Sequence, residues 1–492
     1  MEPRKRETMS LHDHAALVDG IVNHTKSALH WLRTACPVGG RVPSSFDNEA
    51  YQAAWNLSKL SEQYQSFETA FVYASRGLVS LELQEATIVP SDSLLTDTRY
   101  EAYDRQAGLL YGTPAITMGR GALADLIDPS LQISGSRFSY RMDPQIVAVT
   151  QQLLRPLVES QFTLPADWQF AGYTMGQFRR FWLALISIAS LHLTAHHMAA
   201  DRGCVGLGYE SSLFVSDHQG LLNRLSRYSG MAKPITQSIL NDLTYGSQIS
   251  RPDPAIQPIV RLANDQYVIS PGLITSCSPE RNFTVLLNQL PPQRSIYSRL
   301  VEQKEALMRD SMCESIASLH LRSFSGSIPG RKDLPDIDLA IISDIEKACI
   351  IAELKWFIAP AEAREIIQRS EEIQKGIAQM LRLSRAADVD HGMISDLLGI
   401  DSEYELVFVV ISANSIGHGT VQDIRIPVIN QDHLVKKLCS GTSFRGVVSW
   451  LRSRDYLPRE GADYRVVPIV RRVGRWALEW YGIKPLLVDD FA

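Results

Sequence analysis

The chain has 492 residues, 45% of them hydrophobic, and its 54 acidic and 49 basic residues give a formal net charge of -5. This length supports two or three domains with their own cores, and the small negative charge excludes attraction of the whole surface to nucleic acid or anionic membranes. The six cysteines lack CxxC spacing, which argues against a disulfide framework or a structural zinc site and fits a reducing cytoplasm.

Neither a secretory signal nor a membrane span is expected. The charged residues 1–6 are followed by polar residues rather than by an apolar signal core. The longest apolar stretch, residues 181–191, is interrupted by Ser187 and Ser190 and falls short of the ~18 residues that a bilayer span needs. We therefore expect a soluble, cytoplasmic protein with no membrane partner, in which this stretch is a buried helix.

Residues 1–250 show mostly helical spacing of apolar residues. Asp143 followed by Pro144 is typical of a helix start and predicts a helix over residues 145–158. Thr174 is placed to cap a helix over residues 175–200. The region is predicted to be a mostly α-helical domain, whose role the pattern leaves open.

Residues 251–294 are predicted to be a linker. Pro252, Pro254 and Pro258 favour extended backbone. Residues 259–262 and 267–269 are expected to pair as a short hairpin, and a helix is expected to begin at Ser278-Pro279 and to end before Pro291-Pro292.

Residues 295–440 change to an α/β pattern. We expect, in order, a helix, three strands, a helix and a strand, at residues 296–319, 322–328, 337–342, 348–357, 361–385 and 405–412. This order predicts a central mixed sheet flanked by helices on both faces. Residues 441–492 are expected to form a locally basic C-terminal extension. The fold class is thus multi-domain, with a helical domain followed by an α/β domain.

Charged residues interrupt two of the predicted strands at neighbouring ends. Asp336 and Asp338 share one face at the start of the first strand, because alternate side chains of a strand point the same way. Glu353 and Lys355 share one face at the end of the next strand. An ion pair of Glu353 with Lys355 at the sheet end, without catalytic role, is one interpretation.

A bound cation is the other interpretation of these charges. Buried charges need partners or a metal, and Mg²⁺ commonly takes one or two carboxylates together with water and phosphate oxygens. Asp338 and Glu353 are the predicted carboxylate ligands, and the carbonyl of Leu354 is a third oxygen. Lys355 is then placed to orient or deprotonate an attacking water and to offset negative charge in the transition state.

The segment resembles the PD-(D/E)xK nuclease superfamily, whose members have the restriction-endonuclease-like fold. Pro335-Asp336, or Asp336-x-Asp338, followed by Glu353-x-Lys355 in the next strand, matches the pattern of that family over roughly residues 295–440. The acidic-x-Asp form of many relatives makes Asp338 the better match to the metal-binding aspartate, with Asp336 as the alternative because it follows Pro335.

The resemblance also implies supporting residues outside the two strands. An acidic residue in the preceding helix is matched by Glu314, an expected metal ligand. In the following helix, Gln374 and Gln379 match polar residues that some branches use near the metal or the DNA. The sequence departs from the commoner Gln-x-x-x-Tyr form, because no tyrosine stands at that spacing after Gln379.

Basic residues in two places are candidates for contacts with a phosphate backbone. Arg331 and Lys332 precede Asp336, and residues 445–475 hold eight arginines against three acidic residues, with Arg471, Arg472 and Arg475 at the end. The aromatic residues among them are Trp450, Tyr456, Tyr464 and Trp476. A solvated amphipathic surface is an equally weighted interpretation. The histidines at 192 and 196 have helical spacing but lack the His-Glu-x-x-His pattern, so a packed or solvated helix face is predicted.

These observations predict a DNA endonuclease that depends on Mg²⁺, with Mn²⁺ as a substitute, and leaves 5′-phosphates as its apparent relatives do. Restriction or anti-phage defence is suggested by fold-level analogy. An inactive nuclease-fold protein acting as a nucleic-acid-binding or scaffold module is the alternative, and an RNase is the third. Besides DNA, a second copy of the chain and a protein partner of the helical domain are the partners that we consider.

Overall fold

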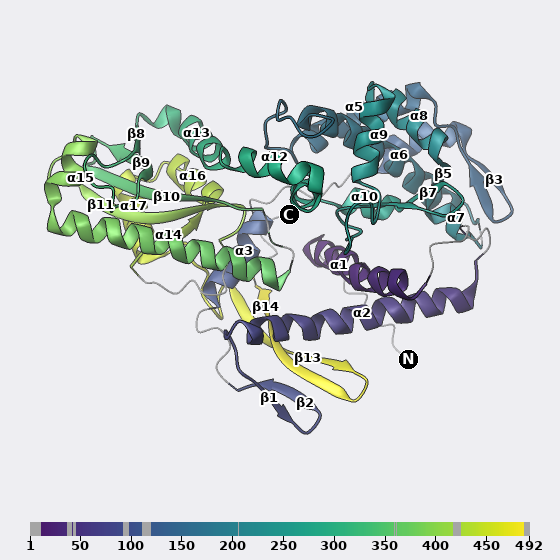
Figure 1. The fold of residues 1–492 in the computed structure, drawn as a ribbon, viewed down its shortest axis with the longest axis horizontal. Coiled ribbons are helices and arrows are strands. Elements are labelled where there is room, and N and C mark those ends of the chain that lie inside the picture. The colour runs from purple at the N-terminus through teal and green to yellow at the C-terminus, as the bar shows by residue number, and fades with distance from the viewer. Residues whose placement is uncertain are drawn as a thin grey trace. The chain divides into compact units, whose positions relative to one another are not determined.

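A computed structural model describes residues 11–36, 42, 46–91, 98–110, 120–204, 206–358, 360, 362–416 and 425–486. The chain forms two compact units, one of Met1–Gln65 with Thr113–Leu300 and one of Ser66–Gly112 with Val301–Ala492 (Figure 1). Both contain helices and sheets, so the predicted multi-domain protein of mixed α/β content is confirmed at that level.

The division of the chain differs from the predicted boundaries in three places. Residues 66–112 group with the second unit, residues 251–294 are part of the first, and residues 441–492 are built into the second. The reason is pairing between distant segments. Strand β2 (Thr87–Pro90) lies parallel to β14 (Trp476–Pro485), with Ile88 opposite Leu478. No local pattern of hydrophobicity encodes such a partnership.

The first unit is mostly helical, with two small sheets. Its helices are α1 (Leu11–Ala35), the start of α2 (Asn48–Ser75), α4 (Arg120–Ile127), α5 (Pro144–Glu159), α6 (Met175–Asp201), α7 (Tyr209–Ser212), α8 (His218–Ser229), α9 (Lys233–Asp242), α10 (Pro271–Ser276), α11 (Pro279–Gln289) and α12 (Pro291–Val301). Its strands are the hairpin β3 (Gln132–Ser134) and β4 (Arg137–Ser139), and the sheet β5 (Phe214–Asp217), β7 (Gln266–Ile269) and β6 (Ile259–Arg261).

Helix α6 is the centre of this unit. Thr174 caps it as predicted, and Gln177 completes a capping box by bonding back to the Thr174 backbone. The helix is long and apolar enough to cross a membrane by composition, but 67% of its most apolar stretch is buried inside the protein. It packs against α4, α5, α8, α9 and α10. This is the environment of a buried core helix, as the sequence predicted.

Two of the histidines of α6 contact the protein backbone. His192 Nε2 and His196 Nδ1 each lie 3.1 Å from the Ser211 carbonyl oxygen, and the Tyr140 hydroxyl lies 3.1 Å from His192 Nδ1. Burial lowers the pKa of His192 to about 4, so the ring is neutral at pH 7. The predicted packed helix face is therefore confirmed for His192.

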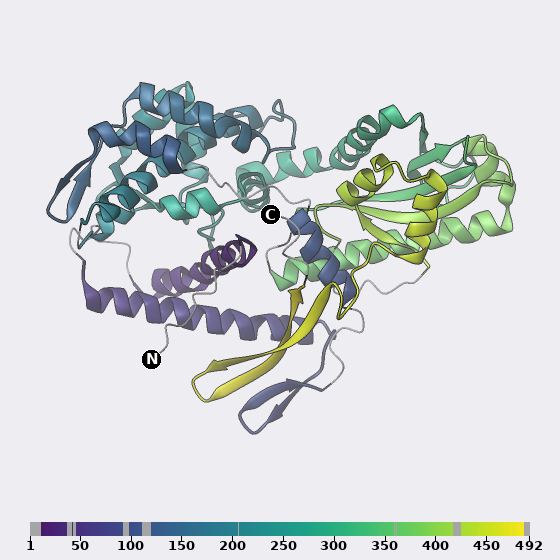
Figure 2. The same cartoon turned by 180° about the vertical axis from the view of Figure 1, so that it is seen from behind.

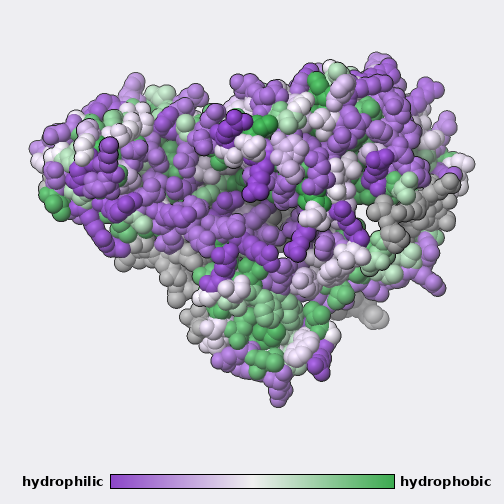
Figure 3. All heavy atoms as spheres, viewed as in Figure 1, coloured by the Kyte–Doolittle hydropathy of each residue, from purple (hydrophilic) through white to green (hydrophobic). Residues whose placement is uncertain are grey.

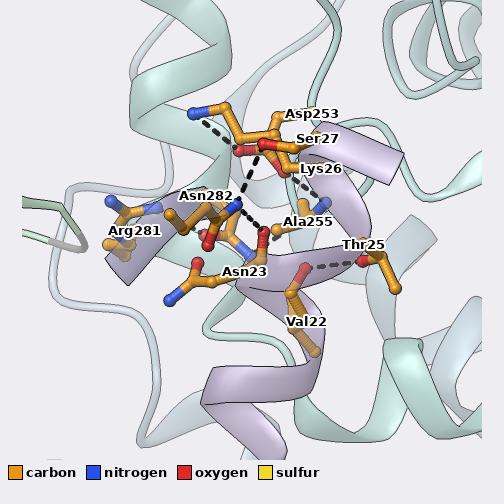
Figure 4. A network of polar contacts seen from close by, with 10 residues as sticks. Val22, Asn23, Thr25, Lys26, Ser27, Asp253, Ala255, Arg281 and Asn282 are labelled. Carbon is orange, nitrogen blue, oxygen red and sulfur yellow. Dashed lines mark hydrogen bonds and ion pairs between the residues drawn. The ribbon is translucent and has the colours of Figure 1, made fainter. Parts of the chain in front are cut away.

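Helix α1 is attached to the first unit by polar contacts (Figure 4). Lys26 Nζ of α1 lies 3.5 Å from Asp253 Oδ2, in the segment where Asn282 of α11 donates to the Ala255 carbonyl oxygen at 2.9 Å. Asp253 and Ala255 belong to the proline-rich segment that we predicted to be a linker. This segment is instead part of the first unit, with Pro252, Pro254 and residues 256–259 buried.

The second unit contains a five-stranded sheet in the order β12-β11-β10-β9-β8. Its strands are β8 (Arg322–Gly326), β9 (Ile337–Ser343), β10 (Ala348–Trp356), β11 (Glu405–Ala413) and β12 (Val428–Asn430), and its helices are α3 (Arg99–Leu110), α13 (Lys304–Ile316), α14 (Ala363–Val389), α15 (His391–Leu398), α16 (Gln431–Cys439) and α17 (Phe444–Ser453). Strands β10, β11 and β12 run parallel, whereas β8 and β9 are antiparallel to their neighbours.

Helices cover both faces of this sheet. Helix α14 lies on one face, and α16 and α17 lie on the other (Figures 1 and 2). Residues 348–354 of the central strand β10 are all buried. This double cover explains why the strand is apolar apart from Glu353 and Lys355. The predicted strands and the helix over residues 361–385 agree with the structure within a few residues. The predicted helix over residues 296–319 is wrong, because α12 ends at Val301 and α13 starts afresh at Lys304.

A second, four-stranded sheet completes this unit, in the order β1-β2-β14-β13. It joins the hairpin of β1 (Leu81–Gln84) and β2 to the hairpin of β13 (Tyr464–Val473) and β14. Helix α3 and the end of α2 pack against it through Ala102 and Tyr73. The predicted basic extension thus contains the helix α17 and two long strands.

Candidate active site

The register of the central sheet brings Asp338 beside the Glu-x-Lys strand. Strands β9 and β10 pair up to Leu339 opposite Ala352, so Asp338 stands at the next position, where the ladder ends. There the Leu354 N–H donates to Asp338 Oδ2 at 2.8 Å. N–H and C=O of one strand residue point to the same side, so the Leu354 carbonyl also faces this edge.

Glu353 and Lys355 lie together at the same end of β10. Lys355 Nζ donates to Glu353 Oε1 at 2.6 Å, and the exposed fractions of the two side chains are 15% and 4%. Because β10 is the central strand and Glu353 lies opposite Val410 of β11, this carboxylate is inside the domain rather than on its rim. The three predicted residues are therefore brought together.

The carboxylates of the site are held in an environment that disfavours their negative charge. Burial, followed by the charge of Asp338, raises the pKa of Glu353 to about 7. Burial also raises the pKa of Asp338, against the hydrogen bond from the Leu354 N–H and the charge of Lys355. Full ionisation of both carboxyl groups is therefore disfavoured in this environment.

Lys355 remains an ammonium ion in this environment. Burial acts to lower the pKa of Lys355, but the hydrogen bond to Glu353 and the surrounding carboxylates outweigh it, so the pKa is raised above its ordinary value. Lys355 can therefore neutralise charge and donate hydrogen bonds at neutral pH. Of its two predicted roles, orienting water fits this state better than deprotonating it.

A residue that the sequence did not predict completes the cluster. Glu305, in the first turn of α13, has Oε1 4.0 Å from Lys355 Nζ, with half of its side chain exposed. Burial and the charge of Asp338 raise the pKa of Glu305, against the charge of Lys355. Lys304 beside it is buried, and its Nζ lies 3.6 Å from the ring centre of Trp356, which fixes this helix turn on β10.

Glu314 does not occupy the place predicted for it. It lies nine residues after Glu305 in α13 and is exposed. At 100° and 1.5 Å per residue, that spacing turns its side chain to the opposite side of the helix and moves it roughly 13 Å along the axis. The helix contributes an acid to the cluster as expected, but the residue is Glu305. The separate start of α13 at Lys304, rather than one helix from residue 296, places Glu305 in the first turn beside Lys355.

Helix α14 closes the site through a glycine. A Cβ at Gly376 would lie 3.3 Å from Glu353 Cγ and 3.4 Å from Lys355 Cε, so the helix approaches the two charged residues as closely as a glycine permits. Gln379, three residues on, lies near this face, whereas Gln374, two residues before, points about 160° away from it. Both glutamines are partly buried.

The residues fit a divalent cation with few protein ligands. Among the described residues no group of three His, Cys, Asp or Glu side chains is arranged to hold a metal. Mg²⁺ does not require one, since it commonly takes one or two carboxylates and fills its remaining positions with water and phosphate oxygens. Asp338 and Glu353, with the Leu354 carbonyl, offer this donor set. Asp336 is exposed and precedes β9, and its charge raises the pKa of Asp338, so it stands near the cluster.

The predicted phosphate-binding residues lie in two separate places. Arg331 is paired within its own loop, with Nε and Nη2 3.0 and 2.9 Å from the two carboxylate oxygens of Asp333, and Lys332 is exposed. The arginines at 471, 472 and 475 are exposed on β13 and the following turn, away from the ends of β9 and β10 in the chain. Of the interleaved aromatic residues, Tyr456 and Tyr464 are buried.

A comparison of the chain with models of protein families, with curated proteins and with solved structures finds no match.

Proposed function

We propose that this protein is a divalent-metal-dependent DNA endonuclease whose active site is built from Asp338, Glu353 and Lys355 in a restriction-endonuclease-like domain. The observation that carries the proposal is the pair of contacts at the end of β10. The Leu354 N–H holds Asp338 at 2.8 Å, and Lys355 holds Glu353 at 2.6 Å. One buried carboxylate, one partly buried carboxylate and one ammonium thus lie together where the pairing of β9 and β10 ends. We further propose a cytoplasmic location.

The roles of the residues follow from their contacts. Asp338 and Glu353 hold the cation, with the Leu354 carbonyl as third protein ligand. When bound, Mg²⁺ lowers the pKa of a coordinated water and polarises the phosphoryl oxygen. The Lys355 ammonium donates to the attacking water and offsets the charge that grows on the phosphate in the transition state. Glu305 keeps Lys355 charged and in place. Hydrolysis leaves a 5′-phosphate if the chain follows the family it resembles.

The direct test is a cleavage assay on supercoiled and linear DNA. We expect nicking or cutting with Mg²⁺ or Mn²⁺ and none with EDTA. Lys355→Ala and Glu353→Gln should each lower the rate about 10³-fold or more. Lys375→Ala, an exposed lysine of α14 paired with Glu372, is the matched control and should cleave normally. A wild-type protein that cleaves nothing, or active versions of both site variants, contradicts the proposal.

A binding or scaffold module is the second candidate. The observation in its favour is the hydrogen bond of Lys355 to Glu353, because an ion pair satisfied within the protein needs no substrate. Such a module would bind DNA with unchanged affinity in Glu353→Gln and would never cut it. The same assay on single-stranded and duplex RNA tests the third candidate, an RNase, which requires faster cleavage of RNA than of DNA.

A further inference from the structure

The register of the four-stranded sheet defines its two faces. Residues directly opposite each other in paired strands point to the same face. Leu83 pairs with Ile88, Ile88 with Leu478, and Leu478 with Arg471. The face defined in this way, called the tryptophan face below, consists of Leu81, Leu83, Ile88, Pro90, Arg465, Val467, Ile469, Arg471, Val473, Trp476, Leu478, Trp480, Gly482 and Lys484. Arg472 pairs with Ala477 on the opposite face.

The tryptophan face presents apolar and aromatic surface to solvent. Leu83 is 58% exposed and Trp476 is 36% exposed, whereas Leu478 between them is buried. Trp480 is partly covered, because its ring packs 6.0 Å from the ring of Tyr73 in α2. An apolar area lies over the region of β1, β2 and β13 (Figure 3). Soluble proteins seldom leave apolar surface of this kind uncovered unless something binds to it.

The charges on the tryptophan face have one sign. Arg465, Arg471 and Lys484 are its charged residues, and no Asp or Glu of the four described strands points to it. Arg475, in the turn between β13 and β14, has its guanidinium carbon 4.8 Å from the ring centre of Trp476. Cations beside an exposed indole are complementary to a polyanion that carries flat apolar groups.

We propose that the tryptophan face binds single-stranded DNA, with a base stacked on Trp476 and phosphates bound by Arg471, Arg475 and Lys484. Unpaired bases can stack on an aromatic ring without regard to sequence, whereas the bases of a duplex are already stacked and paired. The chain is acidic overall, so this concentration of positive charge on one face is what selects a polyanion. The inference extends the proposed nuclease function and rests on it for its biological use.

Helix α14 connects this face to the proposed active site within the second unit. Ala363 and Ile367 at the start of α14 pack in the cluster that contains Trp480, and Gly376 contacts Glu353 and Lys355. Ala363 and Gly376 are 13 residues apart, about 20 Å of helix. A strand of several nucleotides can span that distance, so a single strand held on the tryptophan face can reach the catalytic cluster.

Binding is measured with the full-length protein in EDTA, by the fluorescence anisotropy of labelled oligothymidylate of 4 to 16 nucleotides, a length range chosen from known single-strand site sizes. We expect the wild type to bind longer oligonucleotides more tightly than short ones, and more tightly than duplex of equal length. Trp476→Ala should weaken binding about 10-fold or more, and Trp476→Phe should restore most of it because a phenyl ring also stacks. Arg471→Ala should weaken binding and reduce the dependence on salt by about one phosphate contact.

The matched control is Arg472→Ala. It removes the same charge from the adjacent residue but on the opposite face, and should bind single-stranded DNA within about twofold of the wild type, since a surface charge that makes no contact contributes little. Thermal unfolding followed by circular dichroism confirms that each variant is folded.

Three results overturn the inference: wild-type affinity in Trp476→Ala, tighter binding of duplex than of single strands, or equal losses in Arg471→Ala and Arg472→Ala. A dimer that depends on Trp476, without DNA binding, also overturns it and assigns the face to a second copy. Because no cleavage occurs in EDTA, the result is independent of the nuclease. A wild type that binds as expected but cleaves nothing with Mg²⁺ contradicts only the proposed function, and normal cleavage with unchanged binding in Trp476→Ala contradicts only this inference.

Discussion

Two buried carboxylates, Asp242 in the first unit and Glu353 in the second, are stabilised in contrasting ways. Asp242 Oδ2 accepts hydrogen bonds from the Tyr173 hydroxyl at 2.7 Å and from Gln293 Nε2 at 2.9 Å, both neutral donors. Glu353 accepts one bond from Lys355 and has Asp338 beside it. Burial raises the pKa of both carboxyl groups.

The difference distinguishes a carboxylate that holds the structure together from one that is suited to catalysis. Asp242 joins α9 to the segment around Tyr173 and to α12, so its hydrogen bonds tie three parts of the first unit together. Among the described residues, the hydrogen bond of Glu353 is to Lys355, two residues on in the same strand. A buried carboxylate that links so few parts of the structure is typical of a functional site.

The largest expected effect is on catalysis by Glu353→Gln. The variant keeps the volume of the side chain but loses the charge, so we expect the cleavage rate to fall about 10³-fold, which is about 4 kcal/mol in the transition state. Stability should change by no more than about 1 kcal/mol, because a poorly compensated buried charge is removed. Hydrogen exchange of the β10 amides measures the stability. A large loss of protection with activity retained would make Glu353 structural.

Asp242→Ala should have the reverse profile. The Tyr173 hydroxyl and Gln293 Nε2 lose their acceptor inside the core, so we expect the first unit to be destabilised by about 3 kcal/mol. The cleavage rate of the folded protein should not change. Asp242→Asn retains one acceptor oxygen and should cost less than Asp242→Ala. Urea unfolding and a cleavage assay on the same samples measure both properties, and equal costs for the two variants would argue against the hydrogen-bond explanation.

The first unit should also lose stability in acid because of His192. The pKa of this ring is lowered to about 4 by burial, while the unfolded chain has the ordinary value near 6.5. Between these values the unfolded state binds more protons, so stability falls as the pH drops from about 6.5 towards 4. At pH 5 the loss is about 2 kcal/mol relative to pH 8. In His192→Gln the difference between the two pH values should shrink by that amount; an unchanged difference assigns the acid sensitivity to other groups.

The smallest expected effect concerns the approach of α14 to the site. A methyl group in Gly376→Ala meets Glu353 Cγ and Val410 Cγ2 at 3.3 Å, so neighbouring atoms must shift by a few tenths of an ångström. We expect a roughly 10-fold slower cleavage, about 1.4 kcal/mol, with little change in stability because alanine favours the helix by about 1 kcal/mol. Gly272→Ala in α10, where an added Cβ meets no atom within 4 Å, is the control and should leave the rate unchanged.

Local patterns predicted the central sheet and its charged residues well. Residues 337–342 and 348–357 are otherwise apolar because both faces of the sheet are covered, and this makes Asp338, Glu353 and Lys355 conspicuous in the sequence. Strand periodicity then fixes which of them share a face. The relative positions of side chains within one strand can therefore be predicted from the sequence.

Contacts between distant residues could not be predicted in this way. Glu305 reaches Lys355 only because α13 begins at Lys304, and one residue of shift turns a helical side chain by 100°. Similarly, Arg471 and Arg472 seem equivalent in the sequence, and only the pairing of β13 with β14 assigns them to opposite faces. Nothing in the sequence of hairpin β1–β2 indicates that β2 pairs with a strand near residue 478.

The pairing of Ile88 with Leu478 has a consequence for synthesis. The two residues are 390 positions apart (478 minus 88), so at 5 to 20 residues per second the ribosome needs roughly 20 to 80 s to make the later strand after the earlier one. During that interval the edge of β2 is available to other chains. We expect the newly synthesised β1–β2 hairpin to need a chaperone that covers the edge of β2, or to dock slowly onto β14 once that strand has been made.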